Sequence, residues 1–470
     1  MDDTWITTAL REAGDTRKVV IGRGALAAVD ATFAECFADQ PAVVIADDNT
    51  FAVAGRAVDA RLRAAGRRVV APIVFPGTPP LYADFANVLA LEDQLRALEA
   101  IPVVAGSGTL NDLTKLAAHR VGRPYMCVGT AASMDGYTAF GAAITKGGFK
   151  QTMACPAPRA LLADLDVLIQ APRHMNATGY GDLLGKVTAG ADWILADALD
   201  IESIDARAWP LVQDSLRAWT AHPDKLRAGD PPTIAALFAG LILSGVAMQI
   251  SASSRPASGS EHRFSHLWEM QALGYDHPAV PHGFKVGVGT IAAAALYERL
   301  LARDLIHLDI DALCSAWPSR AEVEVMVRRS HDIPQLAENA VEETLAKYIT
   351  PDQLRERLRL IQARWPGIRE RLRAQLLPAS RLRDLLAAAG CPTDPAAIGI
   401  DLARLQASYA LARTIRSRYT VLDLVYETGL LAEVVQELFA PGGFWTPGPA
   451  AMDRQAGTVP STAWQEEKES

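Results

Sequence analysis

Residues 101–120, IPVVAGSGTLNDLTKLAAHR, carry the clearest strand, turn and helix pattern of the chain. Its first part, Ile101–Ala105, is a short apolar run that predicts a buried strand. Gly106-Ser107-Gly108-Thr109 follows, and Leu110–Arg120 then has the pattern of a helix. Glycines at a strand-to-helix junction let the backbone approach a phosphate, and the helix N-terminus offers N–H groups and partial positive charge. The junction indicates a nucleotide site, although a tight structural turn explains the same residues.

The same alternation of strand and helix patterns surrounds this stretch. Ala42–Ala46 and Val69–Phe75 have strand patterns, and Val53–Ala65 and Phe85–Glu99 have helical ones. This order predicts an α/β domain with a parallel sheet over residues 1–170, whose ligands bind at the carboxyl ends of the strands.

Beyond Pro172 the composition changes, because long segments rich in Ala, Leu and Arg replace the β-branched runs. We expect a helical domain over residues 171–440. The arginine-rich segment Arg355–Arg373 is typical of a solvated helix face. Residues 441–470 are rich in Pro, Gly and polar side chains and predict a flexible tail.

The overall composition excludes several functional classes. The chain has 470 residues, of which 50% are hydrophobic, and its 46 basic and 54 acidic residues give a net charge of -8. This charge offers nucleic acid no general attraction. The five cysteines contain no CxxC pair and no targeting signal begins the chain, so we expect a reducing, cytoplasmic location. The uncharged segment Thr233–Ile250 predicts a buried core helix, in preference to a membrane span.

Two further loops carry polar residues that suit a bound nucleotide or sugar. Asp47 directly follows the strand Ala42–Ala46 and can accept hydrogen bonds from a ribose, or it can cap a helix. The loop Gly129–Tyr137 contains small residues and Asp135, which suit contact with a hydroxyl or a cofactor amide. A simple polar turn with Asp135 as turn former explains this loop equally well.

A cluster of histidines is the most specific candidate for a functional site in the sequence. Four of the nine histidines fall between His262 and His282, and His262 and His266 lie one turn apart if the segment is helical. These imidazoles with one carboxylate from elsewhere can form a site for Zn²⁺ or Fe²⁺ with one open position. The zinc protease motif HExxH requires a glutamate where this chain has Arg263, which argues against a protease. Asp182, expected at a helix start, is the candidate carboxylate, and its alternative role is a helix cap.

Several separate segments together resemble the sn-glycerol-1-phosphate dehydrogenase family, in the superfamily of glycerol dehydrogenase, iron-containing alcohol dehydrogenases and dehydroquinate synthase. The most specific segments are GDLLGK at 181–186 with Asp192-Trp193, SRPASGSEH at 254–262 with Phe264-Ser265-His266, and His282-Gly283. The resemblance implies an N-terminal Rossmann-like domain and an all-α C-terminal domain of the dehydroquinate synthase-like type, with cofactor and metal between them.

The resemblance also implies roles for individual residues. Asp182, His262 and His282 correspond to metal ligands. His266 corresponds to a residue that supports the ligands or handles protons in catalysis, without binding the metal itself, and Asp135 to a catalytic residue that touches the substrate hydroxyl. The cofactor-binding positions that it implies are Asp47, Gly106, Ser107, Gly108, Thr109, Asp112, Thr130 and Ser133.

The implied reaction is the NAD- or NADP-linked interconversion of dihydroxyacetone phosphate and sn-glycerol 1-phosphate, with one Zn²⁺, Ni²⁺ or Fe²⁺ ion. Asp47 should repel a 2′-phosphate and favour NAD. We predict that Lys186 or Arg255, or both, bind the substrate phosphate, with a surface or structural role as the alternative. The expected partners are a small phosphorylated polyol or ketose and further copies of the chain in a homodimer or larger homo-oligomer.

Three positions depart from the family pattern at the cofactor or substrate edge: Gly129, Ala139 and Phe284. They leave two other reactions open on the same site, a polyol dehydrogenase and a dehydroquinate-synthase-like cyclase. A non-catalytic sensor of nucleotides or sugar phosphates is the alternative from another class.

Overall fold

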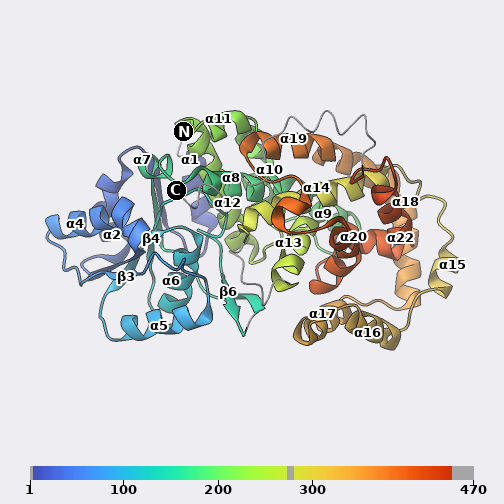
Figure 1. Cartoon of the computed structure of the whole chain (residues 1–470), viewed down its shortest axis with the longest axis horizontal. Helices are drawn as coiled ribbons and strands as arrows, with labels where there is room; N and C mark the ends of the chain where they lie inside the picture. The colour runs from blue at the N-terminus through green and yellow to red at the C-terminus, as the bar shows by residue number, and fades with distance from the viewer. Residues whose placement is uncertain (1–3, 148, 272–279, 447–470) are drawn as a thin grey trace. The chain divides into compact units, whose positions relative to one another are not determined.

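The computed structural model describes residues 4–147, 149–271 and 280–446 (Figure 1). By its internal contacts the chain forms two compact units, one of Met1–Leu183 with Asp205–Ala257 and one of Leu184–Ile204 with Ser258–Ser470. The domain boundaries expected from composition stay a prediction. The expected tail falls largely outside the described residues, since these end at residue 446.

A six-stranded parallel sheet forms the centre of the first unit, in the order β1-β8-β5-β4-β2-β3. Strands β6 and β7 form a separate antiparallel pair, and along the chain they come between β5 and β8. The strands are β1 Lys18–Gly22, β2 Ala42–Asp47, β3 Ile73–Phe75, β4 Ile101–Gly106, β5 Met126–Gly129, β6 Ala142–Lys146, β7 Phe149–Met153 and β8 Ala160–Asp164.

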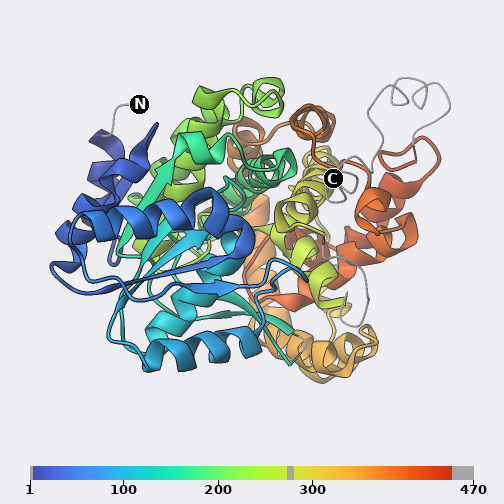
Figure 2. The ribbon, with the colours of Figure 1, turned by 60° about the vertical axis from the view of Figure 1, so that its left-hand side comes forward.

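Helices cover both faces of this sheet (Figures 1 and 2). On one face, alternate strand residues such as Val44 and Val103 form a core cluster with Phe33 of α2 and Val58 of α4. Helices α5 and α6 pack together on the other face, where α6 contacts β2 and β4. The helices of the first unit are α1 Thr4–Glu12, α2 Val29–Phe37, α3 Asp48–Thr50, α4 Arg56–Ala64, α5 Phe85–Arg96, α6 Gly108–Arg120, α7 Leu165–Leu168, α8 Arg173–Leu184, α10 Ala208–Trp219, α11 Pro223–Arg227 and α12 Pro231–Ser251, with short turns η1 Ala25–Ala28 and η2 Phe51–Gly55.

Two elements are shorter or less regular than the sequence pattern predicts. The strand expected over Val69–Phe75 is limited to Ile73–Phe75, and Val69 makes only an isolated bridge to Ala42. Pro72 interrupts the run, because its nitrogen carries no proton to donate to a neighbouring strand. The helix expected from Val53 starts with the π-helical turn η2 before α4 begins.

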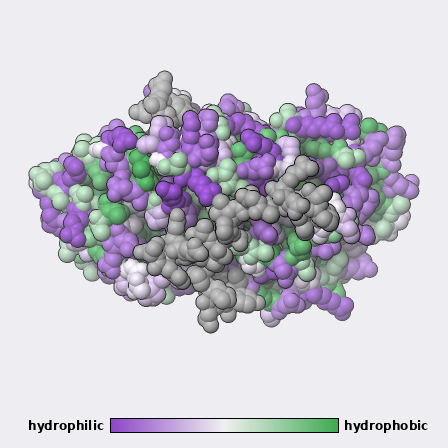
Figure 3. Space-filling model, turned by 45° about the horizontal axis from the view of Figure 1, so that its top comes forward, coloured by the Kyte–Doolittle hydropathy of each residue, from purple (hydrophilic) through white to green (hydrophobic). Residues whose placement is uncertain are grey.

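Helix α12 contains the long uncharged segment. Among the described residues it alone is long and apolar enough to cross a membrane, but 78% of its most apolar window is buried within the protein. Asp230 caps its N-terminus by accepting a hydrogen bond from the Thr233 amide, and prolines occupy its first turn. The expectation of a buried core helix is confirmed. Hydrophilic and hydrophobic residues are interspersed on the face of the molecule shown in Figure 3.

The second unit consists of helices. Its centre is the pair α13 and α14, against which α9, α19, α20, α21 and α22 pack. The helices are α9 Lys186–Ala198, α13 Ser260–Gln271, α14 His282–Leu301, α15 Ile310–Ser315, α16 Arg320–Arg329, α17 Pro334–Ala346, α18 Pro351–Gln375, α19 Ala379–Ala389, α20 Leu402–Leu411, α21 Val421–Glu427 and α22 Leu431–Phe439, with η3 Pro395–Ile398 and η4 Ala412–Ile415.

Helix α18 has one buried stripe and one charged face. Leu354, Leu358, Ile361, Trp365, Ile368 and Leu372 are buried, at spacings of three and four residues that place them on one side of the helix. The arginines of the segment lie largely between them on the exposed side. The two units therefore confirm an α/β N-terminal part and a mostly helical C-terminal part.

Candidate active site

The predicted cofactor residues of the first unit lie at one edge of its sheet. Asp47 ends β2, Gly106 ends β4 and Gly129 ends β5, with Gly106 and Gly129 paired in register. Because neighbouring strands are parallel, their carboxyl ends share an edge, and the following loops start there. The structure thus brings the glycine turn, Thr130 and Asp47 to the same side of the sheet.

The glycine turn leads directly into a helix. Helix α6 begins at Gly108, and its N-cap residue Ser107 makes no capping hydrogen bond with its side chain. A Cβ atom on Gly106 would lie 2.6 Å from the Leu110 Cβ, and one on Gly108 would lie 2.9 Å from the Met134 Cε. Packing therefore requires glycine at position 106, whereas at 108 the flexible Met134 side chain can shift. The N-terminal N–H groups of α6 suit the pyrophosphate of a dinucleotide.

Two predicted cofactor residues already have local partners. Asp47 caps α3, since its Oδ1 accepts hydrogen bonds from the Thr50 amide at 2.7 Å and hydroxyl at 2.8 Å. Asp112 accepts a hydrogen bond from the Ala143 amide at 3.3 Å and lies 3.8 Å from the Lys115 Nζ. Burial raises the pKa of Asp112, whereas Lys115 opposes this shift. Asp112 thus connects α6 to the β6–β7 pair.

The loop after β5 is held by several buried contacts. The Thr130 amide donates to the Gly106 carbonyl at 3.2 Å. The buried Lys115 ammonium donates to the carbonyl oxygens of Gly136 and Ala139 at 2.8 Å and of Gly141 at 3.0 Å. These bonds fix the backbone on both sides of Asp135 and Ser133, so the loop is a defined platform.

Asp135 and Asp182 lie in direct contact within the first unit. The Asp135 amide donates to Asp182 Oδ2 at 3.0 Å, and the Ser244 hydroxyl donates to Asp135 Oδ2 at 2.9 Å. Asp182 is fully buried and lies in the last turn of α8, so its expected position at a helix start is wrong. The residue does not cap the start of a helix, because α8 begins nine residues earlier at Arg173.

In the second unit three histidines face one another. The ring centroids of His262 and His282 are 5.3 Å apart, those of His262 and His266 are 5.8 Å apart, and those of His266 and His282 are 6.0 Å apart. His262 and His266 lie on α13, whereas His282 is the first residue of α14. The packing of these two helices forms the cluster. His277, the fourth histidine of the segment 262–282, lies outside the described residues.

Each of the two predicted histidine ligands contacts a glutamate through Nδ1. His262 Nδ1 lies 2.8 Å from Glu261 Oε1, and His282 Nδ1 lies 3.0 Å from Glu269 Oε1. A carboxylate at Nδ1 stabilises the tautomer that carries its proton there, which leaves the Nε2 lone pair available to a metal ion. This donor arrangement fits a divalent cation such as Zn²⁺, Ni²⁺ or Fe²⁺.

Both glutamates are themselves held in place. Glu261 accepts hydrogen bonds from the Gly259 amide at 2.6 Å and the Thr188 hydroxyl at 2.7 Å. Burial alone would raise the pKa of Glu261, but contact with His262 and these donors lowers it overall. Glu269 forms an ion pair with Lys285 at 2.9 Å. Neither glutamate is among the residues predicted from the sequence, although Glu261 adjoins His262 and Glu269 follows it by seven residues.

His266 has a different environment. Burial lowers the pKa of its imidazole well below 6.5, against the opposing effect of Glu269, and Arg416, His262 and His282 add to the lowering. The ring is therefore neutral near neutral pH, with one nitrogen that can accept a proton.

Asp192 positions the start of α13 and was also missed as a site residue. Its fully buried carboxylate accepts hydrogen bonds from the Ser260 and Val421 amides at 2.6 and 2.8 Å and from the Tyr297 hydroxyl at 2.6 Å. Ser260 is the first residue of α13, two residues before His262. The Asp-Trp pair at 192–193 was noted in the sequence only as part of the family resemblance.

The two residues predicted to bind the substrate phosphate, Lys186 and Arg255, are both fully buried. Lys186 is the first residue of α9, in the second unit, and Arg255 follows α12 in the first. Their burial excludes the surface role that the sequence left open.

Known proteins match this architecture and sequence. A sequence profile of the iron-containing alcohol dehydrogenase family matches residues 20–172. The solved structure of glycerol dehydrogenase from Schizosaccharomyces pombe superposes with a TM-score of 0.57 at 15% identity, covering 95% of this chain and 93% of that one. A maleylacetate reductase structure from Agrobacterium tumefaciens gives a TM-score of 0.56 at 17% identity, covering 92% of this chain and 98% of that one.

The fold and the paired histidines define the class of metal-dependent, NAD(P)-linked alcohol dehydrogenases of the dehydroquinate synthase-like fold. A glycerol-1-phosphate dehydrogenase of Halalkalibacterium halodurans is 39% identical over 256 residues, which cover 54% of this chain and 64% of that protein, just under two thirds of its length. One from Geobacillus stearothermophilus is 30% identical over 412 residues, covering 87% of this chain and 92% of that protein. The chain belongs to the glycerol-1-phosphate dehydrogenase family.

Proposed function

We propose that the protein interconverts dihydroxyacetone phosphate and sn-glycerol 1-phosphate with NAD(H) or NADP(H) and one bound divalent cation. Similarity over 92% of a relative named glycerol-1-phosphate dehydrogenase is the observation that carries this proposal. The carboxylate contacts at His262 Nδ1 and His282 Nδ1 support it independently, because a binding module has no evident need for two imidazoles prepared as ligands.

Asp182, His262 and His282 would hold the cation, since they offer one oxygen and two nitrogen donors. When bound, a divalent cation stabilises negative charge on the carbonyl oxygen of the ketone substrate. This donor set suits zinc, nickel and iron alike.

The remaining residues bind and orient. Asp135, fixed by Asp182 and Ser244, would accept a hydrogen bond from a substrate hydroxyl. His266, neutral near neutral pH, would accept the proton of the alcohol in the oxidation direction and return it from the imidazolium in the reverse direction. Lys186 and Arg255 would bind the phosphate with charge-assisted hydrogen bonds.

For the cofactor, the N-terminus of α6 with Gly106-Ser107-Gly108-Thr109 would receive the pyrophosphate and Asp47 the adenosine ribose, with a preference for NAD. Thr130 and Ser133 would face the nicotinamide. Asp112 would support the glycine turn indirectly, through its contacts with Ala143 and Lys115.

The test is an assay of purified enzyme of known metal content with dihydroxyacetone phosphate or dihydroxyacetone and NADH or NADPH, before and after chelation. We expect oxidation of the cofactor with the phosphorylated ketone, loss after chelation and recovery with added cation. Faster turnover of the free ketone would identify a polyol dehydrogenase, unchanged NAD during substrate conversion would identify a cyclase, and binding without turnover would identify a sensor.

The phosphate assignment has its own test in the substitutions Lys186→Gln and Arg255→Gln. Loss of a charge-assisted bond of about 1.5–3 kcal/mol raises KM for the phosphorylated ketone about 10-fold to 100-fold. The KM for free dihydroxyacetone should change much less, and Arg371→Gln, on the exposed side of α18, is the control. Equal changes in KM for both ketones would refute the assignment.

The homodimer or larger homo-oligomer and the cytoplasmic location are part of the same proposal. Light scattering of the purified chain and microscopy of a tagged chain test them.

A further inference from the structure

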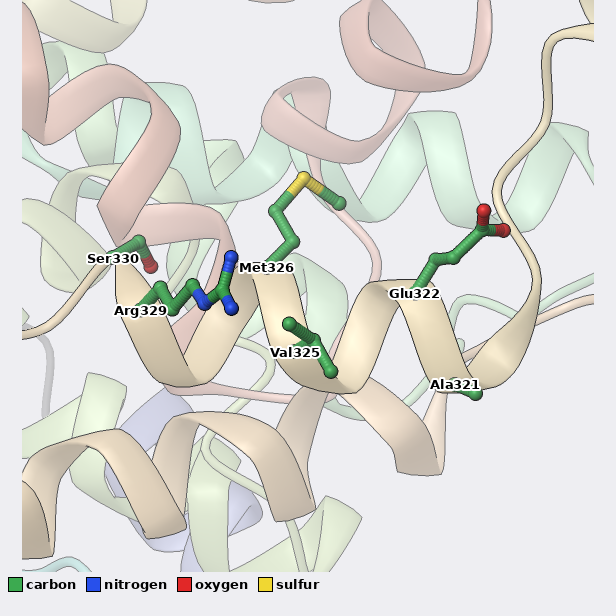
Figure 4. A pocket seen from close by; sticks show the side chains of 6 residues that line it. All are labelled: Ala321, Glu322, Val325, Met326, Arg329 and Ser330. Atoms are coloured by element: carbon green, nitrogen blue, oxygen red, sulfur yellow. The ribbon is translucent and has the colours of Figure 1, made fainter.

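Two cavities of the second unit lie apart from the histidine cluster. The first is a hollow of about 640 Å³ on α16, lined by Val325, Met326 and four neighbours (Figure 4). Its lining comes from a single helix and the residue after it, and nothing in the structure indicates an occupant. The second cavity, of about 560 Å³, has a lining of much higher charge.

This second cavity, here called the η4 cavity, is formed by residues from several helices around η4. Its lining includes four cationic side chains, Lys347, Arg357, Arg413 and Arg418, and three carboxylates, Glu202, Asp423 and Glu427. Aromatic residues, including Tyr348, Tyr419, Tyr426 and Trp317, complete the wall. A volume of this size is typical of sites for small molecules.

Two of the carboxylates are fully occupied by other partners. Asp423 Oδ1 lies 2.7 Å from Lys347 Nζ, and Asp423 Oδ2 lies 3.0 Å from Arg263 Nη1. Glu427 Oε1 lies 2.6 Å from Arg357, and Glu427 Oε2 accepts the hydroxyl proton of Tyr419 at 2.7 Å. Neither carboxylate has an oxygen left without a partner.

Arg413 forms no ion pair within the described residues, and the nearby Asp423, which it influences at longer range, pairs directly with Lys347 and Arg263 instead. Arg413 is only 8% exposed, and its guanidinium stacks on the Tyr426 ring at 3.8 Å from the centroid. A buried cation of this kind is costly unless an anion or several acceptors compensate it.

The electrostatics of Lys347 agree with an excess of positive charge. The pKa of the Lys347 ammonium is lowered to about 7, mainly by burial, with the nearby guanidiniums of Arg263 and Arg413 contributing and Asp423 opposing the shift.

We propose that the η4 cavity binds a small organic phosphate, with the Arg413 guanidinium as its central contact. Arginine suits this role because its planar fork of donors matches the oxygens of a phosphate. The aromatic wall suits the organic part of the ligand, and the volume leaves room for it. This site is separate from the histidine cluster, since none of His262, His266 and His282 lines the cavity.

A ligand in this cavity would be connected to the metal-binding helix. Asp423 contacts Arg263, which follows His262 on α13, and η4 itself packs against α13. We expect a ligand in the cavity to shift α13 through the ion pair between Asp423 and Arg263.

The experiment measures binding of inorganic phosphate and of phenyl phosphate to the full-length protein by calorimetry, with Arg413→Gln, Arg413→Lys and the exposed control Arg371→Gln. We expect wild type and Arg371→Gln to bind phenyl phosphate more tightly than inorganic phosphate. Arg413→Gln should weaken this binding about 10-fold or more, because a charge-assisted contact is lost. Arg413→Lys should weaken it less, since it keeps the charge but loses the fork.

Binding at the proposed catalytic phosphate site is recognised by a second set of variants. Binding heat that persists in Arg413→Gln but disappears in the double variant Lys186→Gln, Arg255→Gln comes from the proposed catalytic phosphate site. Unchanged binding in Arg413→Gln, or binding lost only in the double variant, overturns the proposal. If Arg413→Gln does not fold, Arg413→Lys decides, and wild-type affinity in that variant also overturns it.

Discussion

Replacing Glu269 by glutamine should weaken metal binding without removing a ligand. The Glu269 carboxylate is 6% exposed and lies 3.0 Å from His282 Nδ1, so it both orients the ring and increases the basicity of Nε2. Loss of such a carboxylate weakens metal affinity by about 10-fold to 100-fold. Glutamine keeps an acceptor oxygen, so we expect about 10-fold, or about 1.4 kcal/mol. Alanine removes the contact, so Glu269→Ala should approach 100-fold, or about 2.7 kcal/mol.

The assay is titration of metal-free protein with Zn²⁺ in competition with a chelator of known affinity. Glu433→Gln is the matched control, because this glutamate is 59% exposed and pairs with Arg303. Wild-type zinc affinity in both Glu269 variants would refute the argument that this carboxylate prepares His282 as a ligand. Equal losses of affinity in the control would show a general effect of acidic residues.

Three other substitutions test the structure. Asp423→Asn removes the carboxylate between two buried cations and should lower the free energy of unfolding by about 3–5 kcal/mol in denaturant titrations. Burial alone would raise the pKa of Asp423, but the adjacent cations lower it from 3.8 to about 2, so its contribution to stability is present above pH 3.8 and is lost as the pH falls through 2. The variant should therefore lose part of the acid dependence of unfolding, and an unchanged pH profile would contradict this. Gly106→Ala places a Cβ 2.6 Å from the Leu110 Cβ and should shift the glycine turn. We therefore expect NADH binding, measured by cofactor fluorescence, to weaken about 10-fold or more. Lys115→Met leaves three carbonyl oxygens without their donor and should lower the melting temperature and kcat together, whereas a fall in neither would show that the loop around Asp135 needs no such support.

The sequence predicted elements best where a local pattern is strong. The run Ile101–Ala105 and the glycine turn gave β4 and the start of α6 nearly to the residue, because both periodicity and backbone freedom are local properties. The strand expected over Val69–Phe75 was too long. Its β-branched residues favour a strand, but Pro72 has no backbone N–H to donate to a neighbouring strand. Asp182 was placed at a helix start although it lies near the end of α8, because Gly179 and Gly181 before it indicate a break that the helix does not have.

The α/β and helical parts, the buried character of α12, the family and the histidine spacing within α13 were all predicted from sequence patterns alone. These depend on patterns within one segment, which side-chain periodicity and composition reveal. The packing of separate elements sets which glutamate contacts which histidine, that Asp135 contacts Asp182, and that no carboxylate of the described residues forms an ion pair with Arg413. Such pairings join residues from separate elements, and helix packing, rather than any local preference, selects them.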